Sequence, residues 1–129
     1  MIALSNTIHG YARPESKERW LEFSTTVLGL KRTTTPPPYW SGSPELFYAF
    51  EFSNGKVLSG EFTEDALDDE QAQHGLWLEL KTDDAEELQQ KVLDFGLKKV
   101  VHPYTSFFYF QAPGGQVFRI VSSKEIERT

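Results

Sequence analysis

The order of the predicted elements repeats within the chain, and this repeat limits the folds that the chain can adopt. In each half, a short strand precedes a helix that ends at a Gly-Leu pair, and a hairpin with a glycine turn follows. The pairs begin at Gly29 and Gly96, 67 residues apart, whereas the turn glycines Gly55 and Gly115 lie 60 apart. A Thr- and Pro-rich insert at residues 33–39 accounts for the difference. One half alone cannot bury its sheet, so the repeat predicts two β-α-β-β-β units that share one core.

Two helices are predicted from apolar side chains that recur at helical spacing. The first covers residues 15–27 and has its apolar stripe at Trp20, Phe23 and Val27. The second covers residues 83–93, with Leu88 and Val92 on one face. Asp83 and Glu86 have the spacing of a capping box, in which each side chain accepts a hydrogen bond from an otherwise unpaired backbone N–H.

Strands fill most of the remaining chain, because aromatic and β-branched residues alternate with polar ones. The predicted strands are residues 8–12, 46–52, 56–62, 76–81, 106–110 and 116–121. Asn54 and Gly55 predict a two-residue type I′ turn, since both residue types tolerate positive φ. Gly114 and Gly115 predict the corresponding turn of a second hairpin. The three prolines at residues 36–38 cannot donate ladder hydrogen bonds, so residues 33–38 are predicted to form a loop or an edge.

Composition excludes several classes of function. The 129 residues carry a net charge of −6 and no basic cluster, which argues against a nucleic-acid partner. No run approaches 18 apolar residues, and residues 1–6 lack the pattern of a signal peptide, so we expect no membrane partner and a cytoplasmic protein. Cysteine is absent, which excludes disulfides and a thiolate nucleophile. The acidic concentration at residues 61–70 is interpreted as a solvated connector, or alternatively as a feature that attracts a cationic ligand.

Three motifs in this order resemble the vicinal oxygen chelate superfamily, which includes glyoxalase I, extradiol dioxygenases and bleomycin-resistance proteins. They are Leu28-Gly29-Leu30 after a helix that contains Phe23, Thr82-Asp83-Asp84-Ala85 before a helix that ends at Gly96, and Ala112-Pro113-Gly114-Gly115-Gln116. The last resembles the family's Asp-Pro-x-Gly-Asn turn, with Ala112 and Gln116 as departures. The resemblance implies an α+β fold in which two βαβββ modules form a curved mixed sheet around a concave pocket, commonly in a dimer.

The expected organisation is a single glyoxalase/bleomycin-resistance-like domain over residues 1–129. Module one covers about residues 1–63, an acidic linker about 64–74, module two about 75–123, and a C-terminal tail 124–129.

The resemblance also implies where a divalent metal would bind, because family enzymes take ligands from the first and last strand of each module. Counting along the predicted strands puts His9, Ser59, Trp77 and Arg119 at the four positions. Only His9 could coordinate: an indole cannot, and a guanidinium repels a cation. His74 precedes Trp77 by three residues and falls in the loop before the strand. We therefore expect neither a metal nor another cofactor.

Strand parity predicts which side chains share the concave face with these positions. Across a two-residue turn, Phe50 opposes Ser59, Tyr48 opposes Glu61 and Phe52 opposes Val57, and the 60-residue offset adds Phe108 and Phe110. The predicted ligand-binding residues are His9, Tyr48, Phe50, Ser59, Glu61, Trp77, Glu79, Phe108, Phe110 and Arg119. Aromatic walls with a few polar groups are typical of a small-molecule site. In the alternative interpretation, the rings fill the space between the sheets and Glu61 or Glu79 holds Arg119.

These observations favour a metal-free small-molecule binding protein that sequesters or senses a partly aromatic ligand, as a homodimer that completes the pocket. Arg119 suits a carboxylate or phosphate, and Glu61 or Glu79 an amine. One alternative is a metal-dependent lyase, isomerase or dioxygenase of the same superfamily, and another is an interaction module without a ligand. Whether the protein is an enzyme stays open: His9 with a nearby carboxylate permits acid–base chemistry, but no nucleophile elbow or phosphate-binding glycine loop is present.

Overall fold

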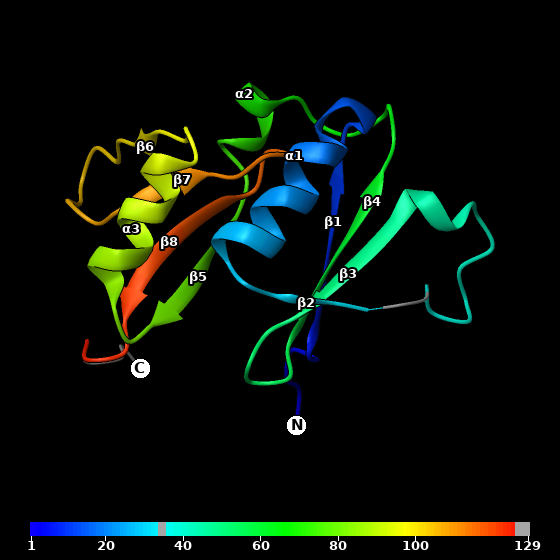
Figure 1. Ribbon diagram of the computed structural model, residues 1–129, viewed down its shortest axis with the longest axis horizontal. Helices are drawn as coiled ribbons and strands as arrows, with labels where there is room; N and C mark the ends of the chain where they lie inside the picture. The colour runs from blue at the N-terminus through cyan, green and yellow to red at the C-terminus, as the bar shows by residue number, and fades with distance from the viewer. Residues whose placement is uncertain (34–35, 126–129) are drawn as a thin grey trace.

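The repeat is visible in the fold as two four-stranded sheets, each with its own helix (Figure 1). The computed structural model describes residues 1–33 and 36–125; the predictions for residues 34–35 of the insert and 126–129 of the tail lie outside the described residues. Module one consists of β1 (Thr7–Ala12), α1 (Lys17–Glu22), β2 (Lys31–Arg32), β3 (Phe47–Glu51) and β4 (Val57–Phe62). Module two consists of β5 (Trp77–Thr82), α3 (Ala85–Asp94), β6 (Lys99–Val100), β7 (Tyr109–Gln111) and β8 (Val117–Ser122).

Both sheets have the same topology, with strand orders β1-β4-β3-β2 and β5-β8-β7-β6. In each, the first and last strands of the module pair in parallel, and the other pairings are antiparallel. The first strand of each module is therefore an edge strand. This arrangement confirms the predicted α+β fold of two βαβββ modules.

The first helical segment joins the two modules. Pro14–Ser16 forms a 3-10 turn before α1, and a π-helical turn over Phe23–Val27 continues it until Gly29, whose φ of +64° ends the helix. Its apolar stripe is buried as predicted, and the segment lies between the sheets (Figure 1). The ring of Phe23 lies 5.8 Å from that of Phe95 and 5.8 Å from that of Phe110, both in module two. One core therefore extends across both modules.

The N-cap of the second helix lies one residue later in the chain than predicted. The carboxylate of Asp84 accepts a hydrogen bond from the N–H of Glu87 at 3.0 Å, whereas the Asp83 carboxylate accepts one from the hydroxyl of Ser123 at 2.7 Å. Both aspartates precede glutamates at the right spacing, so only the course of the chain at the end of β5 decides which one caps. The prediction that Asp83 is the cap was wrong by one residue.

The loops of the two hairpins are longer than predicted, and this difference changes the pairing register of their strands. Each hairpin loop has three residues, 53–55 and 113–115, because Phe52 pairs with Lys56 and Ala112 with Gln116. Gly55 has a φ of +85° and Gly115 of +106°, while Asn54 is not in the left-handed region. A type I turn followed by a left-handed glycine is the usual three-residue hairpin. The predicted two-residue type I′ turn was therefore wrong, and the pairing register is shifted by one residue.

A shift of one residue moves the strand's side chains to the opposite face of the sheet. Ala49, not Phe50, is opposite Ser59, and Phe47, not Tyr48, is opposite Glu61. In module two, Tyr109 is opposite Arg119 and Phe110 is opposite Phe118. Four of the five Phe, Tyr and Trp residues predicted to line the concave pocket therefore lie on the helix-covered side: Tyr48, Phe50, Phe108 and Phe110.

The connector between the modules is more ordered than a solvated loop. It contains the short helix α2 (Asp69–Ala72), which begins with a capping box between Asp68 and Gln71. Within the described part of the chain, no helix is long and apolar enough to cross a membrane.

Candidate functional site

The open face of the first sheet, on the side away from α1, carries a hydrogen-bonded histidine. The Nδ1 atom of His9 lies 2.7 Å from the hydroxyl of Ser59, and its Nε2 atom lies 3.1 Å from a carboxylate oxygen of Glu61. Parallel pairing of β1 with β4 places His9 directly beside Ser59. The side chains of His9 and Glu61 are about a quarter exposed, and Ser59 is buried. The sequence therefore correctly grouped these three residues on one face.

Aromatic rings surround this histidine. The ring of His9 stacks on Phe47, with centroids 5.4 Å apart and planes 17° from parallel, and meets the edge of Tyr11 at 5.3 Å. Trp40, from the segment before β3, packs on the other end of Phe47 at 5.1 Å. Neither Phe47 nor Trp40 was predicted, because the predicted register turned Phe47 away and no periodicity marks the loop. The result is a wall of aromatic rings with one imidazole and one carboxylate.

The open face of the second sheet carries a buried arginine. Arg119 is 3% exposed. Its guanidinium donates hydrogen bonds to Glu79 at 3.0 Å and to Glu125 at 2.7 Å. The Cζ atom of the guanidinium lies 3.6 Å from the ring centroid of Phe107, and the Nε–H has no hydrogen-bond partner among the described residues. The pairing with Glu79 is the one that the alternative interpretation of the sequence expected, and Glu125 was not predicted.

A second group of aromatic side chains lies next to Arg119 and is partly exposed to solvent. Trp77 is 47% exposed, and its ring meets the edge of Tyr109 at 5.5 Å. His102, from the loop after β6, stacks on Tyr109 with centroids 5.3 Å apart. Trp77 and Glu79 share this face, as alternation along β5 predicted. Tyr109 takes the place predicted for Phe108 and Phe110.

The resemblance implies metal ligands on the first and last strands of each module, and the strand ladders show which residues face one another there. His9 is opposite Ser59 at the third residue of its strand, and Glu79 is opposite Arg119 at the third residue of β5. Counting back from the second helix had placed Trp77 there, but Trp77 is opposite Val117. His74 lies in the turn after α2, before β5 begins.

This set of side chains does not fit a divalent ion. A guanidinium occupies one position and is ion-paired to the carboxylate at another, and Ser59 is a neutral hydroxyl already bonded to His9. Within residues 1–33 and 36–125, no three His, Asp or Glu side chains are grouped so that they could hold a metal ion. No step of a reaction is therefore assigned to a metal in this protein.

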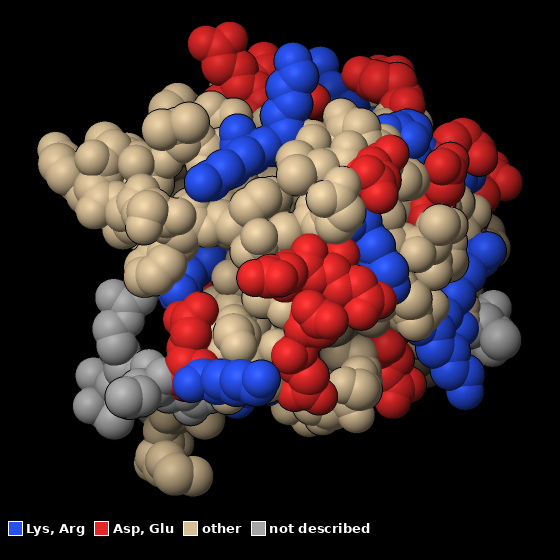
Figure 2. All heavy atoms as spheres, turned by 60° about the vertical axis from the view of Figure 1, so that its left-hand side comes forward, with Lys and Arg blue, Asp and Glu red and all other residues tan. Residues whose placement is uncertain are grey.

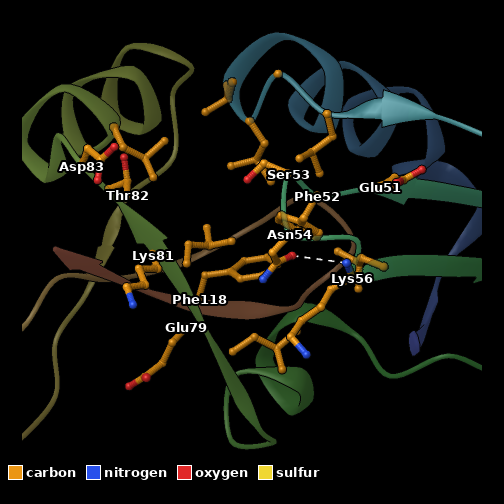
Figure 3. A pocket seen from close by; sticks show the side chains of 18 of the residues that line it. Glu51, Phe52, Ser53, Asn54, Lys56, Glu79, Lys81, Thr82, Asp83 and Phe118 are labelled. Atoms are coloured by element: carbon orange, nitrogen blue, oxygen red, sulfur yellow. Dashed lines mark hydrogen bonds between the residues drawn. The ribbon is translucent and has the colours of Figure 1, made fainter. Parts of the chain in front are cut away.

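A separate cleft, which the sequence did not predict, lies between the modules (Figure 3). It has a volume of about 1000 Å³ and is bounded by the end of the first helical segment, the β3–β4 hairpin, β5 and α3. Over the module-two side of the molecule, acidic side chains form a contiguous group in the middle of the view, with basic side chains around it (Figure 2). No periodicity in the sequence marks such a cleft, because its walls come from elements of both modules that only the packing of the modules brings together.

Comparisons with known proteins identify this architecture. No protein-family model matches the sequence, and a comparison with curated proteins finds no similar sequence. A glyoxalase/dioxygenase from Nostoc punctiforme is similar in structure, with a TM-score of 0.70 at 15% identity over 97% of this chain and 99% of that one. FosX, a fosfomycin resistance protein from Mesorhizobium loti, has a TM-score of 0.66 at 15% identity, with coverages of 93% and 91%.

TnmS3, an antibiotic binding protein from Streptomyces sp. CB03234, has a TM-score of 0.64 at 14% identity, with coverages of 94% and 96%. Matches at this low identity, over nearly the whole of each chain, show the fold. Together with the two βαβββ modules, they show that this chain has the fold of the vicinal oxygen chelate superfamily, the glyoxalase/bleomycin resistance/dioxygenase proteins that its motifs resemble.

Proposed function

We propose that this protein binds a small, partly aromatic molecule without a metal ion, and that it sequesters or senses that molecule. The observation that carries this proposal is the buried guanidinium of Arg119, bonded to Glu79, at a position where the family resemblance implies a metal ligand. A fixed positive charge there favours an anionic group of a ligand and opposes a cation. The fold, the aromatic walls and the structural likeness to FosX, a fosfomycin resistance protein, and to TnmS3, an antibiotic binding protein, support binding of a drug-like molecule.

Each open face offers a different set of contacts to such a ligand. On the first sheet, the rings around His9 suit stacking, and the Glu61 carboxylate suits an amine or hydroxyl donor. On the second sheet, Trp77 offers an exposed indole, and the buried Nε–H of Arg119 has no partner among the described residues. Glu125 is 39% exposed at its side chain, so a ligand carboxylate could replace it on Arg119.

The two faces belong to separate sheets of one chain, and we propose that a homodimer closes the pocket. β1 and β5 are edge strands, and unpaired strand edges are surfaces on which another chain can pair. Leu76 and Tyr11, on or next to these edges, are large apolar side chains that are well exposed. Sedimentation velocity tests the assembly: a dimer that is lost in Tyr11→Arg supports this arrangement, and a monomeric wild type contradicts it.

Tryptophan fluorescence tests the binding proposal, because the three tryptophans occupy different environments. Trp20 is buried in the core and reports folding, Trp40 lies beside the first face, and Trp77 lies on the second. In a screen of small aromatic acids, amines and antibiotics, a true ligand should quench emission at one or both faces. Trp77→Phe should remove the quenching from the second face, and Trp40→Phe that from the first.

Two outcomes would contradict the proposal and favour the alternatives. One tightly held divalent ion per chain, found by elemental analysis of protein purified without chelator and lost in His9→Ala, would favour a metal-dependent lyase, isomerase or dioxygenase. Absence of quenching by every ligand class would favour an interaction module.

A further inference from the structure

The guanidinium of Arg119 is buried but only partly hydrogen-bonded. Glu79 accepts from Nη1 at 3.0 Å and Glu125 accepts from Nη2 at 2.7 Å, whereas the Nε–H has no partner among the described residues. Most buried polar side-chain atoms in folded proteins are paired, so an unpaired one on a residue that is 3% exposed requires an explanation. The hydroxyl of Thr105 is the other such atom in the described part of the chain, and it belongs to the loop whose Phe107 lies over the guanidinium.

Glu125 uses only half of the edge of the guanidinium to which it binds. The Nε–H and one Nη2–H point in the same direction, so a carboxylate can accept from both with its two oxygens. Glu125 presents only Oε2 to this edge, and its Oε1 accepts from the N–H of Ser122 at 3.3 Å. In this position, Glu125 makes one bond to the guanidinium instead of two.

The position of Glu125 depends on few contacts. Its side chain is 39% exposed, and it extends from the turn after β8 rather than from a strand. The backbone N–H of Glu125 bonds to the carbonyl of Ser122 within that turn. Glu125 can therefore leave the guanidinium without breaking a strand pairing. An ion pair with a partly exposed partner contributes little net stability, so another carboxylate can replace Glu125 at small cost.

The charges of this face favour an anion once Glu125 has moved away. Among the described residues of β5, β7 and β8, alternation places three charged side chains on the open face: Glu79, Lys81 and Arg119. Figure 3 shows Glu79 and Lys81 extending from the same side of β5. Two positive charges thus accompany one negative charge, and the carboxylate of Glu125 balances the excess. A ligand carboxylate keeps this balance, whereas an amine would add a cation beside the guanidinium.

We propose that the ligand of this face is an aromatic carboxylate, a molecule in which a short linker joins a carboxylate to an aromatic ring. This inference rests on the proposed function, the binding of a small, partly aromatic molecule. The ligand carboxylate takes the place of Glu125 and accepts from both the Nε–H and Nη2 of Arg119, while the ring contacts the aromatic side chains of the face. Glu125 is then an internal competitor that occupies the guanidinium when no ligand is bound.

Isothermal titration calorimetry with matched naphthalene compounds tests the ligand class. Naphthylacetate, naphthylethanol and naphthylethylammonium share the ring and differ in the charge of the polar group. We expect one molecule of naphthylacetate per chain, bound at least tenfold more tightly than the alcohol or the amine. Acetate, which lacks the ring, should also bind at least tenfold more weakly. Arg119→Met should weaken naphthylacetate binding at least tenfold and remove its advantage over the alcohol.

A pair of glutamate variants tests the competition. Glu125→Ala should strengthen naphthylacetate binding at least fivefold, because it removes the competing carboxylate and leaves Glu79 on Arg119. Glu86→Ala makes the same change of side chain and net charge at an exposed position of α3, and should leave the affinity unchanged. Thermal unfolding of both variants verifies that they are folded.

Three results would overturn the inference. Equal affinity of the wild type for the acid, the alcohol and the amine would show that only the ring is recognised, and the proposed function would stand. Unchanged or weaker naphthylacetate binding in Glu125→Ala would show that Glu125 does not compete. Absence of naphthylacetate binding in both wild type and Glu125→Ala would exclude this ligand class, whereas the fluorescence screen with other classes would still decide the proposed function.

Discussion

Replacing the buried Arg119 should lower the free energy of unfolding, and the burial of its charge and the exposure of its partners determine by how much. Arg119→Met removes a guanidinium whose side chain is 4% exposed, while its partners Glu79 and Glu125 are 50% and 39% exposed at their side chains. Without the arginine, both carboxylates can remain in water. The variant therefore loses two charge-assisted hydrogen bonds but leaves no buried charge behind.

The magnitude follows from these contacts. A hydrogen bond to a charged group contributes about 1.5–3 kcal/mol when both partners are buried. Here the acceptors are half exposed, which lowers that contribution. Removing a buried ion also recovers its desolvation cost. We expect Arg119→Met to lower the free energy of unfolding by about 1–2 kcal/mol, a fall in Tm of about 4–8 °C for a chain of this size.

Neutralising the two carboxylates, instead of removing the arginine, should lower the free energy of unfolding further. Combining Glu79→Gln with Glu125→Gln leaves the guanidinium buried without a counter-charge, a situation that typically destabilises a protein by about 3–5 kcal/mol. Urea unfolding of wild type, Arg119→Met and the double glutamine variant measures the order. If Arg119→Met unfolds more easily than the double variant, the guanidinium is not a desolvated charge held by these carboxylates, and the reasoning about this face is refuted.

Three further predictions test the register and the caps. Phe110→Ala should lower the free energy of unfolding by about 3–5 kcal/mol in urea denaturation, because this ring is fully buried in the shared core; a cost below about 1 kcal/mol would place it on an open face. Gly55→Ala should cost about 1 kcal/mol in thermal unfolding, since Gly55 has a φ of +85°, whereas Gly55→Asn, which tolerates that conformation, should cost less; the reverse order would contradict the three-residue loop. Asp84→Ala should cost about 1 kcal/mol in thermal unfolding through loss of the helix cap, and Asp83→Ala should cost less; equal costs would mean that Asp84 is not the cap.

Much of the fold was predictable from local patterns. Helical spacing located the main helix of each module, and alternation located the longer strands, because each pattern depends on residues close together in the chain. The two-residue strands β2 and β6 and the short helix α2 were not predicted, and β7 begins three residues later than predicted. The repeat then implied that two modules share a core, which the contact of Phe23 with Phe95 and Phe110 confirms. The family resemblance placed His9 and Ser59 at neighbouring positions of the site, and the structure pairs them in the parallel ladder of β1 and β4.

The candidate site was predictable only in part, because its aromatic residues depend on hairpin register. Asn54-Gly55 is compatible with a two-residue turn and with the last two residues of a three-residue loop, and the sequence alone does not choose between them. The observed loop places Ala49 instead of Phe50, and Tyr109 instead of Phe110, on the open faces. Packing decides the choice, since this register places Phe50 and Phe110, rather than the smaller or polar residues, beneath the helices.

The sequence by itself determined the βαβββ repeat and the approximate positions of its two main helices and its longer strands. The tertiary structure decided which carboxylates hold Arg119, which rings lie beside it, and that a cleft lies between the modules. The physical reason is distance along the chain. Periodicity and capping act over a few residues, whereas the pairing of Arg119 with Glu79 and the walls of the cleft join residues far apart in the sequence, which only the folded chain brings into contact.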